Sequence, residues 1–345
     1  MTDNVPAKGF MSSAHTANGT THGQHHPELI VPKVMSAVAY HRYGTPEVLQ
    51  SIMAVTPQPG AQQALVRVRA AGVNPIDYRM RQGELRWVLP GGFPRIPGYD
   101  IAGDVVACPA EAPFSVGDRV FAFLDNKYGG GYAEYAACAV SGMARMPEGM
   151  SYEQAAAIPL AATTALQSLR DHGLIRSGNR VLINGASGGV GAFAIQIAKA
   201  FDAHVTAVAS DKNEGYVRSL GANAFIDRLR IDFTQSAERW DLIFDAAGKS
   251  NFLAASQVLT HGGRYVSTEP SVWGALVSVA SMILPKHSRV MLARPRAADL
   301  QDLATRFSQH QLQVEINEVF ALDGASAAHR RLEKGIDRGK LVLRI

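Results

Sequence analysis

The sequence predicts an α/β fold in which a doubly wound parallel sheet accompanies a β-rich domain. Two observations support this prediction. From Met35 onward, short apolar segments are separated by Gly and Pro turns, which is typical of a compact, barrel-like domain. After Gly178, apolar strands alternate with helical stretches, which indicates a parallel sheet with crossover helices. The length of 345 residues suits about two domains.

The composition excludes several classes of protein. With 47% hydrophobic and 19% charged residues, the chain is expected to be globular. The formal net charge is only +4, and no run of Lys and Arg could follow a phosphate backbone, so nucleic acid is not an expected partner. The longest apolar run, 272–284, is shorter than the about 20 residues that span a bilayer, so no membrane span is expected. Two cysteines and no secretory signal predict a cytoplasmic protein.

The N-terminal half contains a tail and then the β-rich domain. Residues 1–34 are rich in Ser, Thr, Asn, Gly and His and are expected to be disordered; weak metal binding by their histidines is the less favoured hypothesis. Strands are expected at 36–40, 64–71, 98–106 and 118–124. The sequence Ser151-Tyr-Glu-Gln154 fits a capping box and predicts the start of a helix.

The C-terminal half has the pattern of the parallel sheet. Strands are expected at 180–184, 203–209, 224–227, 241–245 and 263–267. A helix at 322–339 and a last strand at 341–345 are expected to follow.

A glycine-rich turn lies between the first of these strands and an Ala-rich helix. Residues 186–191 match G-x-G-x-x-G with Ala in the first place. Gly188 lets the backbone approach a pyrophosphate, and Gly191 lets the helix pack closely on the strand. The helix N-terminus offers unpaired N–H groups to phosphate. Strand, turn and helix in this order predict a Rossmann unit that binds a dinucleotide through Ala186, Ser187, Gly188, Gly189 and Val190.

The end of the second strand favours NADPH over NADH. NAD enzymes place an acidic residue there to accept from the ribose 2′-OH. Here Ser210 and Asn213 can bond a 2′-phosphate, and Lys212 supplies charge. Asp211 is the residue that argues against NADPH. Arg228, after the third strand, is either a second phosphate contact or an ordinary surface arginine.

Several motifs in order resemble one known family, the zinc-free quinone oxidoreductase branch of the medium-chain dehydrogenases/reductases. The resemblance covers 35–345 and rests on Ala71-Gly-Val-Asn-Pro-Ile-Asp77, Pro97-Gly-Tyr-Asp-Ile-Ala-Gly103, Val116-Gly-Asp-Arg-Val120, Gly130-Gly-Tyr-Ala-Glu-Tyr135, Ala156-Ala-Ile-Pro-Leu160, the phosphate loop, Val217-Arg-Ser-Leu-Gly-Ala222 and Arg338-Gly-Lys-Leu-Val342.

The resemblance implies a domain order. Residues 35–160 would form a GroES-like catalytic domain, 161–300 an inserted Rossmann domain that binds NADPH, and 301–345 a segment that completes the catalytic domain. The active site would lie in the cleft, with Thr164 at the nicotinamide and with Ala246 and Lys340 among the cofactor contacts. A homodimer is expected, because relatives are often dimers through their Rossmann strands.

The resemblance also implies chemistry without a metal. Zinc-using members place a Cys where this chain has Asn74, and a His-Glu pair where it has Tyr99-Asp100. Zn²⁺ polarises an alcohol or carbonyl as a Lewis acid. Without it, the remaining chemistry is hydride transfer from NADPH to a small hydrophobic acceptor that is already activated, namely a quinone or an α,β-unsaturated carbonyl compound.

The negative charge formed on the acceptor oxygen needs a hydrogen-bond donor or a cation, and then a proton. Asn74 can donate from its amide and Tyr78 from its phenol. Arg79, where many relatives carry Tyr or Lys, can stabilise charge but cannot release a proton. Tyr78 is therefore the favoured proton donor, with water as the alternative and a merely packed aromatic ring as the competing interpretation.

Four residues are expected to contact the substrate, namely Tyr99, Lys127, Tyr128 and Trp273. Lys127 and Tyr128 lie on a glycine-rich loop that could equally be a plain mobile loop. The apolar run 272–284, which contains Trp273, is a lid, a subunit interface or a core helix. Two other functions stay open: an enoyl-thioester reductase, and an NADPH-binding redox sensor with little catalysis.

Overall fold

The computed structural model describes residues 31–345 except 88 and 270–271. The predicted disordered tail at 1–34 therefore lies almost entirely outside the described residues. Its last residue, Val34, already begins strand β1. Among the described residues, no helix is long and apolar enough to cross a membrane.

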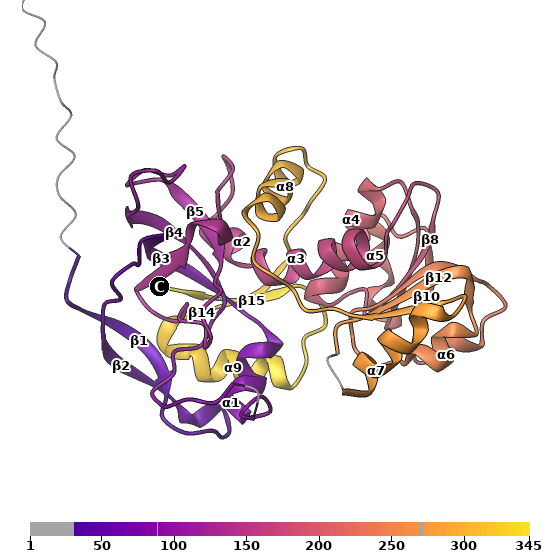
Figure 1. Ribbon diagram of the computed structural model, residues 1–345, viewed down its shortest axis with the longest axis horizontal. Helices are drawn as coiled ribbons and strands as arrows, with labels where there is room; N and C mark the ends of the chain where they lie inside the picture. Colours follow the sequence, from indigo (N-terminus) through magenta and orange to yellow (C-terminus); the bar gives the residue numbers. More distant parts are fainter. Residues whose placement is uncertain (1–30, 88, 270–271) are drawn as a thin grey trace, which may run out of the picture. The chain divides into compact units, whose positions relative to one another are not determined.

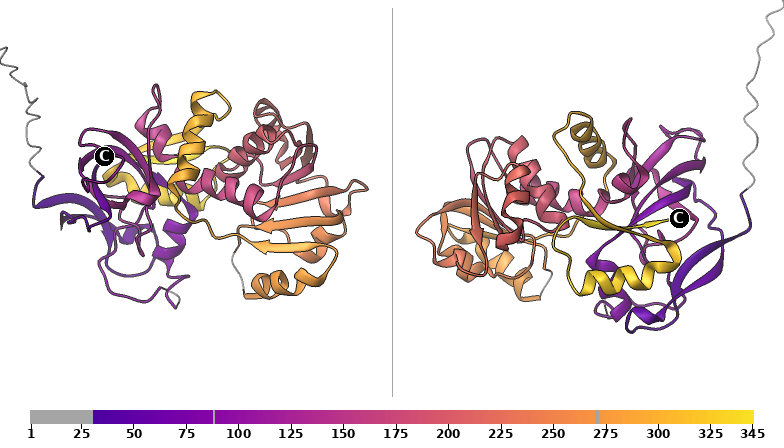
Figure 2. Two further views of the ribbon diagram at one scale, coloured as in Figure 1. Left: turned by 45° about the horizontal axis from the view of Figure 1, so that its top comes forward. Right: turned by 180° about the vertical axis from the view of Figure 1, so that it is seen from behind.

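The β-rich lobe is built on a seven-stranded sheet with the strand order β14-β15-β3-β4-β5-β7, and β6 pairs with β3. Strands β14 and β15 come from the C-terminal end of the chain, which returns to this lobe after the parallel sheet (Figure 2). A hairpin of β1 and β2 accompanies the sheet. The strands are β1 (Val34–Tyr40), β2 (Leu49–Val55), β3 (Gln63–Val73), β4 (Asp100–Ala107), β5 (Arg119–Phe123), β6 (Tyr135–Ala139), β7 (Met143–Arg145), β14 (Ile316–Ala321) and β15 (Lys340–Arg344).

Local signals determine where the helices of this lobe begin. Helix α1 (Pro75–Gln82) starts with Pro in its first turn, and the Asp77 carboxylate accepts from the backbone N–H of Asn74. Helix α2 (Tyr152–Ala156) has the predicted capping box, in which Ser151 and Gln154 bond each other's backbone N–H groups. Helix α9 (Ala325–Glu333) buries Ala325 and Ala328 against the sheet.

The Rossmann lobe contains a six-stranded parallel sheet in the order β10-β9-β8-β11-β12-β13. This order reverses between β8 and β11, which is the switch point where such sheets bind ligands. The strands are β8 (Arg180–Asn184), β9 (His204–Ala209), β10 (Ala224–Asp227), β11 (Trp240–Asp245), β12 (Leu259–Ser267) and β13 (His287–Val290). The helices are α3 (Pro159–Gln167), α4 (Gly189–Ala200), α5 (Glu214–Ser219), α6 (Phe252–Ser256), α7 (Val272–Ala280) and α8 (Ala297–Ser308), and a π-helical turn (Ser168–His172) extends α3 (Figure 1).

Helices α2 and α3 join the two lobes through small side chains. Their alanines are buried, and one continuous hydrophobic core runs from Phe121 of β5 through them to Val181 of β8 and Phe193 of α4. A shared core of this kind fixes the position of one lobe against the other.

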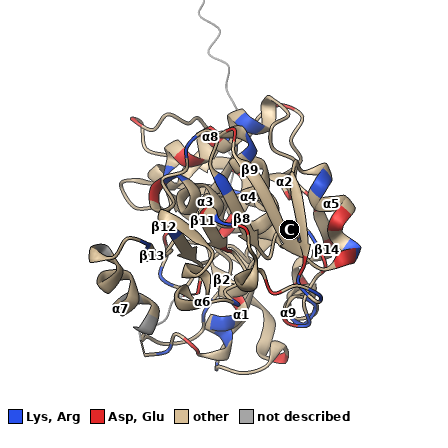
Figure 3. Ribbon diagram, turned by 90° about the vertical axis from the view of Figure 1, so that its right-hand side faces the viewer, with Lys and Arg blue, Asp and Glu red and all other residues tan. Residues whose placement is uncertain are grey.

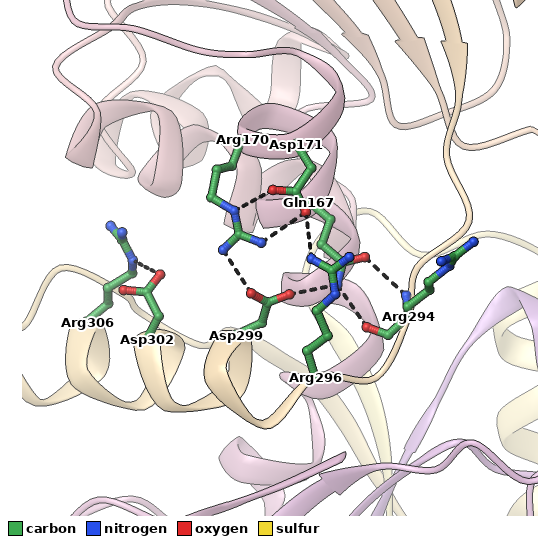
Figure 4. Close-up of polar contacts among 8 residues, drawn as sticks. All are labelled: Gln167, Arg170, Asp171, Arg294, Arg296, Asp299, Asp302 and Arg306. Atoms are coloured by element: carbon green, nitrogen blue, oxygen red, sulfur yellow. Dashed lines mark hydrogen bonds and ion pairs between the residues drawn. The ribbon is translucent and has the colours of Figure 1, made fainter. Parts of the chain in front are cut away.

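A polar network also fastens α8 to α3 (Figure 4). The Gln167 amide donates to Asp299 at 2.7 Å and to the carbonyl oxygen of Arg294 at 2.8 Å. Arg170 pairs with the second oxygen of Asp299 at 2.8 Å. Gln167 and Asp299 are both buried, so their bonds are shielded from water. Because α8 also packs against β7, this network is a second junction between the lobes.

The predicted strands of the parallel sheet are confirmed, and β8 and β10 have the predicted bounds. The predicted helix at 322–339 is wrong in length. Helix α9 ends at Glu333, because Gly335 and Gly339 adopt the left-handed φ values of +86° and +75°. A short 3₁₀ turn (Leu322–Gly324) precedes it.

Candidate active site

A cavity of about 1070 Å³ lies between the two lobes. The β-rich lobe contributes Val73, Asn74 and Pro75 at the start of α1, and Lys340 at the start of β15. The Rossmann lobe contributes the loops that follow β8, β9, β10 and β11. The cavity therefore lies at the switch point of the parallel sheet, where the loops after neighbouring strands meet.

The glycine-rich loop after β8 has the geometry that a dinucleotide requires. Gly185 has φ of +80°, and Gly188 is the extended N-cap residue of α4. A Cβ atom on Gly191 would lie 2.2 Å from the carbonyl oxygen of Gly185, so only glycine fits where the helix crosses the loop. A Cβ on Gly188 would meet only that oxygen, at 3.4 Å, because this residue borders the cavity. The first N–H groups of α4 have no partner within the helix and can bind phosphate.

The loops after β9 and β10 form the end of the cavity that contains cations. Ser210, Lys212, Asn213 and Arg228 line the cavity; Asp211 does not, but Asp232 and Asp337 do. The Asn213 amide donates to the Ser187 hydroxyl at 3.2 Å and to the Ser210 hydroxyl at 3.3 Å, which ties the two loops together. Lys212 forms an exposed ion pair with Asp337 at 2.6 Å.

Ten of the twelve predicted cofactor contacts line this one cavity. Ala246 and Lys340 are among them, and the two that do not line it are Thr164 and Ala186. Ala186 is fully buried beneath the loop. The Thr164 hydroxyl donates to the carbonyl oxygen of Leu160 at 2.7 Å, and Leu160 itself lines the cavity.

A buried charged cluster stands at the β-rich side of the cavity. Asn74 donates from its amide to Asp100 at 2.8 Å and accepts from the Lys340 ammonium. Asp77 accepts from the backbone N–H groups of Asn74 and Gly98, at 2.8 and 3.2 Å. Burial raises the pKa of Asp77 to about 7 and that of Asp100 to about 6, and it lowers the pKa of Lys340.

A chain of buried polar groups extends from Asp77 into the β-rich lobe. The Tyr132 hydroxyl donates to Asp77 at 3.4 Å and lies 3.2 Å from Nε2 of His329. Arg81 donates to Nδ1 of His329 at 3.3 Å. Because a guanidinium only donates, Nδ1 accepts, and the neutral ring has its proton on Nε2. Burial, aided by the charge of Arg81, lowers the pKa of His329 to about 3.

Tyr78 and Arg79 do not line the cavity with Asn74. Tyr78 is half-buried, and burial raises the pKa of its hydroxyl. Arg79 pairs with Glu269, which follows β12, through bonds of 2.7 and 3.1 Å, and with Glu84 at 2.6 Å. The guanidinium of Arg79 is therefore paired with two carboxylates in this structure.

Three of the four predicted substrate contacts, Tyr99, Lys127 and Tyr128, are tied to the chain near Pro90 and do not line the cavity. The Lys127 ammonium and the Tyr128 hydroxyl both donate to the carbonyl oxygen of Pro90, at 2.6 and 2.7 Å. The Tyr99 hydroxyl bonds the backbone of Lys127 at 3.1 Å. These bonds hold the loop 125–131 against the chain at Pro90. Trp273 lies in α7, but its side chain is outside the described residues.

Helix α7 exposes a row of apolar side chains. Leu276 is 59% exposed, Val279 69% and Ile283, just beyond the helix, 91%. The helix contains no charged residue (Figure 3), and its Gly274 and Val277 border a second cavity of about 430 Å³ beside Glu269. Such exposure argues against the core-helix interpretation of the run 272–284.

The sequence-based prediction missed three acidic residues of the site. Asp77 could have been found, because Asn74-Pro-Ile-Asp77 has the spacing of a capping box. The roles of Asp100 and Glu269 depend on contacts with Asn74 and Arg79, which are distant in sequence, and no local signal reports them. In the part of the chain that the structure describes, no three His, Cys, Asp or Glu side chains are grouped as metal ligands.

Two family models match the chain. Residues 60–148 match the alcohol dehydrogenase GroES-like domain, and residues 220–343 match a model described as a zinc-binding dehydrogenase. The two matches fall on the β-rich lobe and on most of the Rossmann lobe with the C-terminal segment.

Three similar proteins cover between 70% and 91% of the chain. A chloroplastic quinone-oxidoreductase homolog of Spinacia oleracea is 31% identical over 329 residues, which is 90% of this chain and 98% of the relative. An NADPH-dependent alkenal/one oxidoreductase of Arabidopsis thaliana is 35% identical over 256 residues, 70% of this chain and 64% of the relative. The structure of the quinone oxidoreductase from Coxiella burnetii superposes with a TM-score of 0.84 at 31% identity, covering 91% of this chain and all of that one.

Proposed function

We propose that this chain, which belongs to the quinone oxidoreductase branch of the medium-chain dehydrogenase/reductase superfamily, transfers hydride from NADPH to a quinone or an α,β-unsaturated carbonyl compound. The family makes it an oxidoreductase with a nicotinamide cofactor. The proposal goes beyond family membership in two respects, namely NADPH as the form of the cofactor and a quinone or conjugated carbonyl compound as the acceptor. Relatives named as quinone oxidoreductases and as an alkenal/one oxidoreductase support this choice of acceptor.

The cofactor proposal rests on the cavity. NADPH would lie along the glycine-rich loop, with its pyrophosphate at Gly188, Gly189 and the N-terminus of α4. The 2′-phosphate would meet Ser210, Lys212, Asn213 and Arg228. Asp211 is not among the lining residues, but Asp232 and Asp337 are, so the phosphate would have to take Lys212 from its ion pair with Asp337. Bound NADPH supplies a hydride and both electrons of the reduction.

The single observation that most supports reduction of a conjugated acceptor is the place of Asn74. Asn74 lines the same cavity as the dinucleotide loop, so a residue with an N–H donor and the hydride source would meet there. Addition of hydride to the β-carbon moves an electron pair onto the acceptor oxygen, and a nearby N–H stabilises that charge. Water then supplies the proton, or Tyr78 does so if its hydroxyl, which does not line the cavity, reaches the acceptor oxygen. Arg79 would contribute its charge only if it left Glu269.

The residues at the place of the zinc site of related dehydrogenases do not fit a metal ion. Asn74 accepts from the Lys340 ammonium, and a divalent cation at this position would meet a positive charge. A thiolate or imidazole, which zinc prefers, is present at neither Asn74 nor Tyr99. This arrangement supports a zinc-independent reaction. Catalysis by a homodimer in the cytoplasm, with Tyr99, Lys127, Tyr128 and Trp273 near the substrate, also stays a prediction.

The test is to follow the oxidation of NADPH and of NADH with quinones, enones, enals and enoyl-CoA as acceptors. We expect turnover with quinones or enones, a preference for NADPH, and no effect of metal chelators. Turnover with enoyl-CoA alone would favour an enoyl-thioester reductase. Tight binding of NADPH with every acceptor at background would contradict the proposal and favour a redox sensor.

A further inference from the structure

The charged cluster beside the cavity contains a lysine that is isolated from water. The Lys340 side chain is 5% exposed, Asp100 is 0% exposed and Asn74 is 1% exposed. Removal of an ammonium and a carboxylate from water costs several kcal/mol each, unless good geometry and hydrogen bonds compensate. An apolar side chain as long as lysine would fill the same space without this cost. The buried ammonium of Lys340 is therefore expected to have a function other than packing.

The bonds of the cluster determine which way the Asn74 amide faces. An ammonium only donates hydrogen bonds, so the atom of Asn74 that Lys340 contacts must be the oxygen Oδ1. An ionised carboxylate only accepts, so the atom that Asp100 contacts must be Nδ2. Rotation of the amide by 180° would face Lys340 with an N–H group and Asp100 with an oxygen. Both contacts would then become repulsive.

Both partners of the amide are themselves held in place. The second oxygen of Asp100 accepts from the backbone N–H of Leu160 at 2.8 Å, at the start of α3. A Cβ on Gly72 would lie 3.1 Å from Oδ2 of Asp100, so the backbone of β3 supports the carboxylate closely. The Lys340 stem passes the phosphate loop, where a Cβ on Gly189 would lie 2.7 Å from its Cδ.

We propose that Lys340 and Asp100 are positioning residues that hold the Asn74 amide in one orientation, with one N–H of Nδ2 left for the oxygen of the acceptor. Among the described residues, Asp100 is the one acceptor that Nδ2 has, so its second N–H is left without a protein acceptor, and Asn74 lines the cavity. The inference rests on the proposed function, because it assigns this N–H to the acceptor oxygen. In this inference Lys340 does not touch the acceptor and affects the reaction only by holding the Asn74 amide in place.

The electrostatics of the cluster give this role a pH dependence. Asp100 faces Lys340 of β15 and the carboxylate of Asp77 in α1. Lys340 lowers the pKa of both carboxyl groups, against the larger effect of their burial. A protonated Asp100 could donate to Oδ1, and the preference for one amide orientation would be lost. The rate should therefore fall as the pH drops through about 6, and Lys340→Met should move this fall to higher pH.

The test is a double-mutant cycle of Lys340→Met and Asn74→Leu, with Lys340→Arg as the variant that keeps a cation. The measured quantities are kcat with the best quinone or enone and the dissociation constant of NADPH. We expect Asn74→Leu to lower kcat on the order of 100-fold, as for loss of one oxyanion donor. Lys340→Met should lower kcat at least tenfold at saturating NADPH, a condition needed because Lys340 is also a predicted cofactor contact, and Lys340→Arg should recover most of the rate. In the Asn74→Leu background, Lys340→Met should lower kcat no further.

A second measurement does not depend on turnover. In protein labelled with ¹⁵N-asparagine, the side-chain signal of Asn74 is identified by its loss in Asn74→Leu. We expect the N–H proton that Asp100 accepts to exchange slowly with solvent in the wild type and much faster in Lys340→Met. Unchanged exchange, or losses of kcat that multiply in the double variant, would overturn the inference. If exchange responds but no acceptor is reduced, the positioning stands and the proposed function fails.

Discussion

The Arg79 guanidinium and the Glu269 carboxylate form a two-bond ion pair that joins α1 of the β-rich lobe to the segment after β12 of the Rossmann lobe. Arg79 is 30% exposed and Glu269 45% exposed, so solvent and salt weaken the pair. It connects the lobes at a place distinct from the buried Gln167–Asp299 network. We therefore expect the Arg79–Glu269 pair to open more easily than that network.

Glu269→Gln should release the dinucleotide faster. Loss of a partly exposed ion pair of about 0.5–1 kcal/mol corresponds to about a two- to fivefold increase in the dissociation rate. Stopped-flow fluorescence of NADPH release measures it. The matched control is Glu84→Gln, which also removes a partner of Arg79 but within the β-rich lobe, and which should leave the rate unchanged. Equal effects of the two variants would contradict a link between the lobes, as would a wild-type rate that high salt does not raise.

Two glycines of the phosphate loop should respond differently to alanine. Gly191→Ala places a methyl group against the backbone of Gly185 and should lower the free energy of unfolding by more than about 1 kcal/mol. Gly188→Ala meets only ordinary contact at 3.4 Å and has an extended backbone, so it should fold normally. Its methyl group would border the cavity and weaken binding of NADPH and NADH alike. Urea unfolding and fluorescence titration separate the two effects; normal NADPH affinity in Gly188→Ala would argue against pyrophosphate at this residue.

Lys212→Ala should change the choice of cofactor. Loss of a charged hydrogen bond to the 2′-phosphate corresponds to about a 10- to 100-fold weaker NADPH affinity, while NADH should bind nearly as before. The control is Lys249→Ala, which removes a cation from the lining after β11 and should not distinguish the two dinucleotides. The measurement is the dissociation constant of NADPH and of NADH for the wild type and for both variants. Equal losses in Lys212→Ala would overturn the NADPH assignment.

His329 should make the fold sensitive to acid. Its pKa is lowered to about 3 in the folded chain, whereas a free imidazole titrates near 6.5. Below pH 6.5 the unfolded chain binds this proton first, so the stability that the neutral ring contributes is lost progressively as the pH falls toward 3. The raised pKa values of Asp77 and Asp100 act in the opposite direction, because there the folded chain binds protons first.

The variant His329→Gln isolates the histidine. Between pH 7 and pH 5 the wild type should lose about 2 kcal/mol more free energy of unfolding than this variant, at about 1.4 kcal/mol per pH unit. Tyr132→Phe keeps the buried ring and should retain the acid loss of the wild type. Urea unfolding at the two pH values tests this, and parallel losses in wild type and His329→Gln would contradict it.

Much of the fold follows from local patterns in the sequence. Period-two and apolar segments predict β8 and β10 at their observed bounds, and the capping box at Ser151 predicts the start of α2. The strands β2, β6, β7, β13 and β14 escaped prediction. They are short or exposed and are stabilised by pairing with distant strands, a contribution that no local window contains. The helix predicted at 322–339 was too long for a different reason: its apolar spacing continued past Gly335, although a glycine there is a local signal for a helix end.

The sequence by itself determined the dinucleotide loop, because the glycines at 188, 189 and 191 act through their own backbone and that of their near neighbours. It also predicted Asn74 as a candidate donor to the acceptor oxygen. The tertiary structure alone decided which way that amide faces and what Arg79 binds. Asp100, Lys340 and Glu269 are far from their partners along the chain, and hydrogen bonds are effective only within about 3 Å. Such contacts exist only after the two lobes have folded around the cavity.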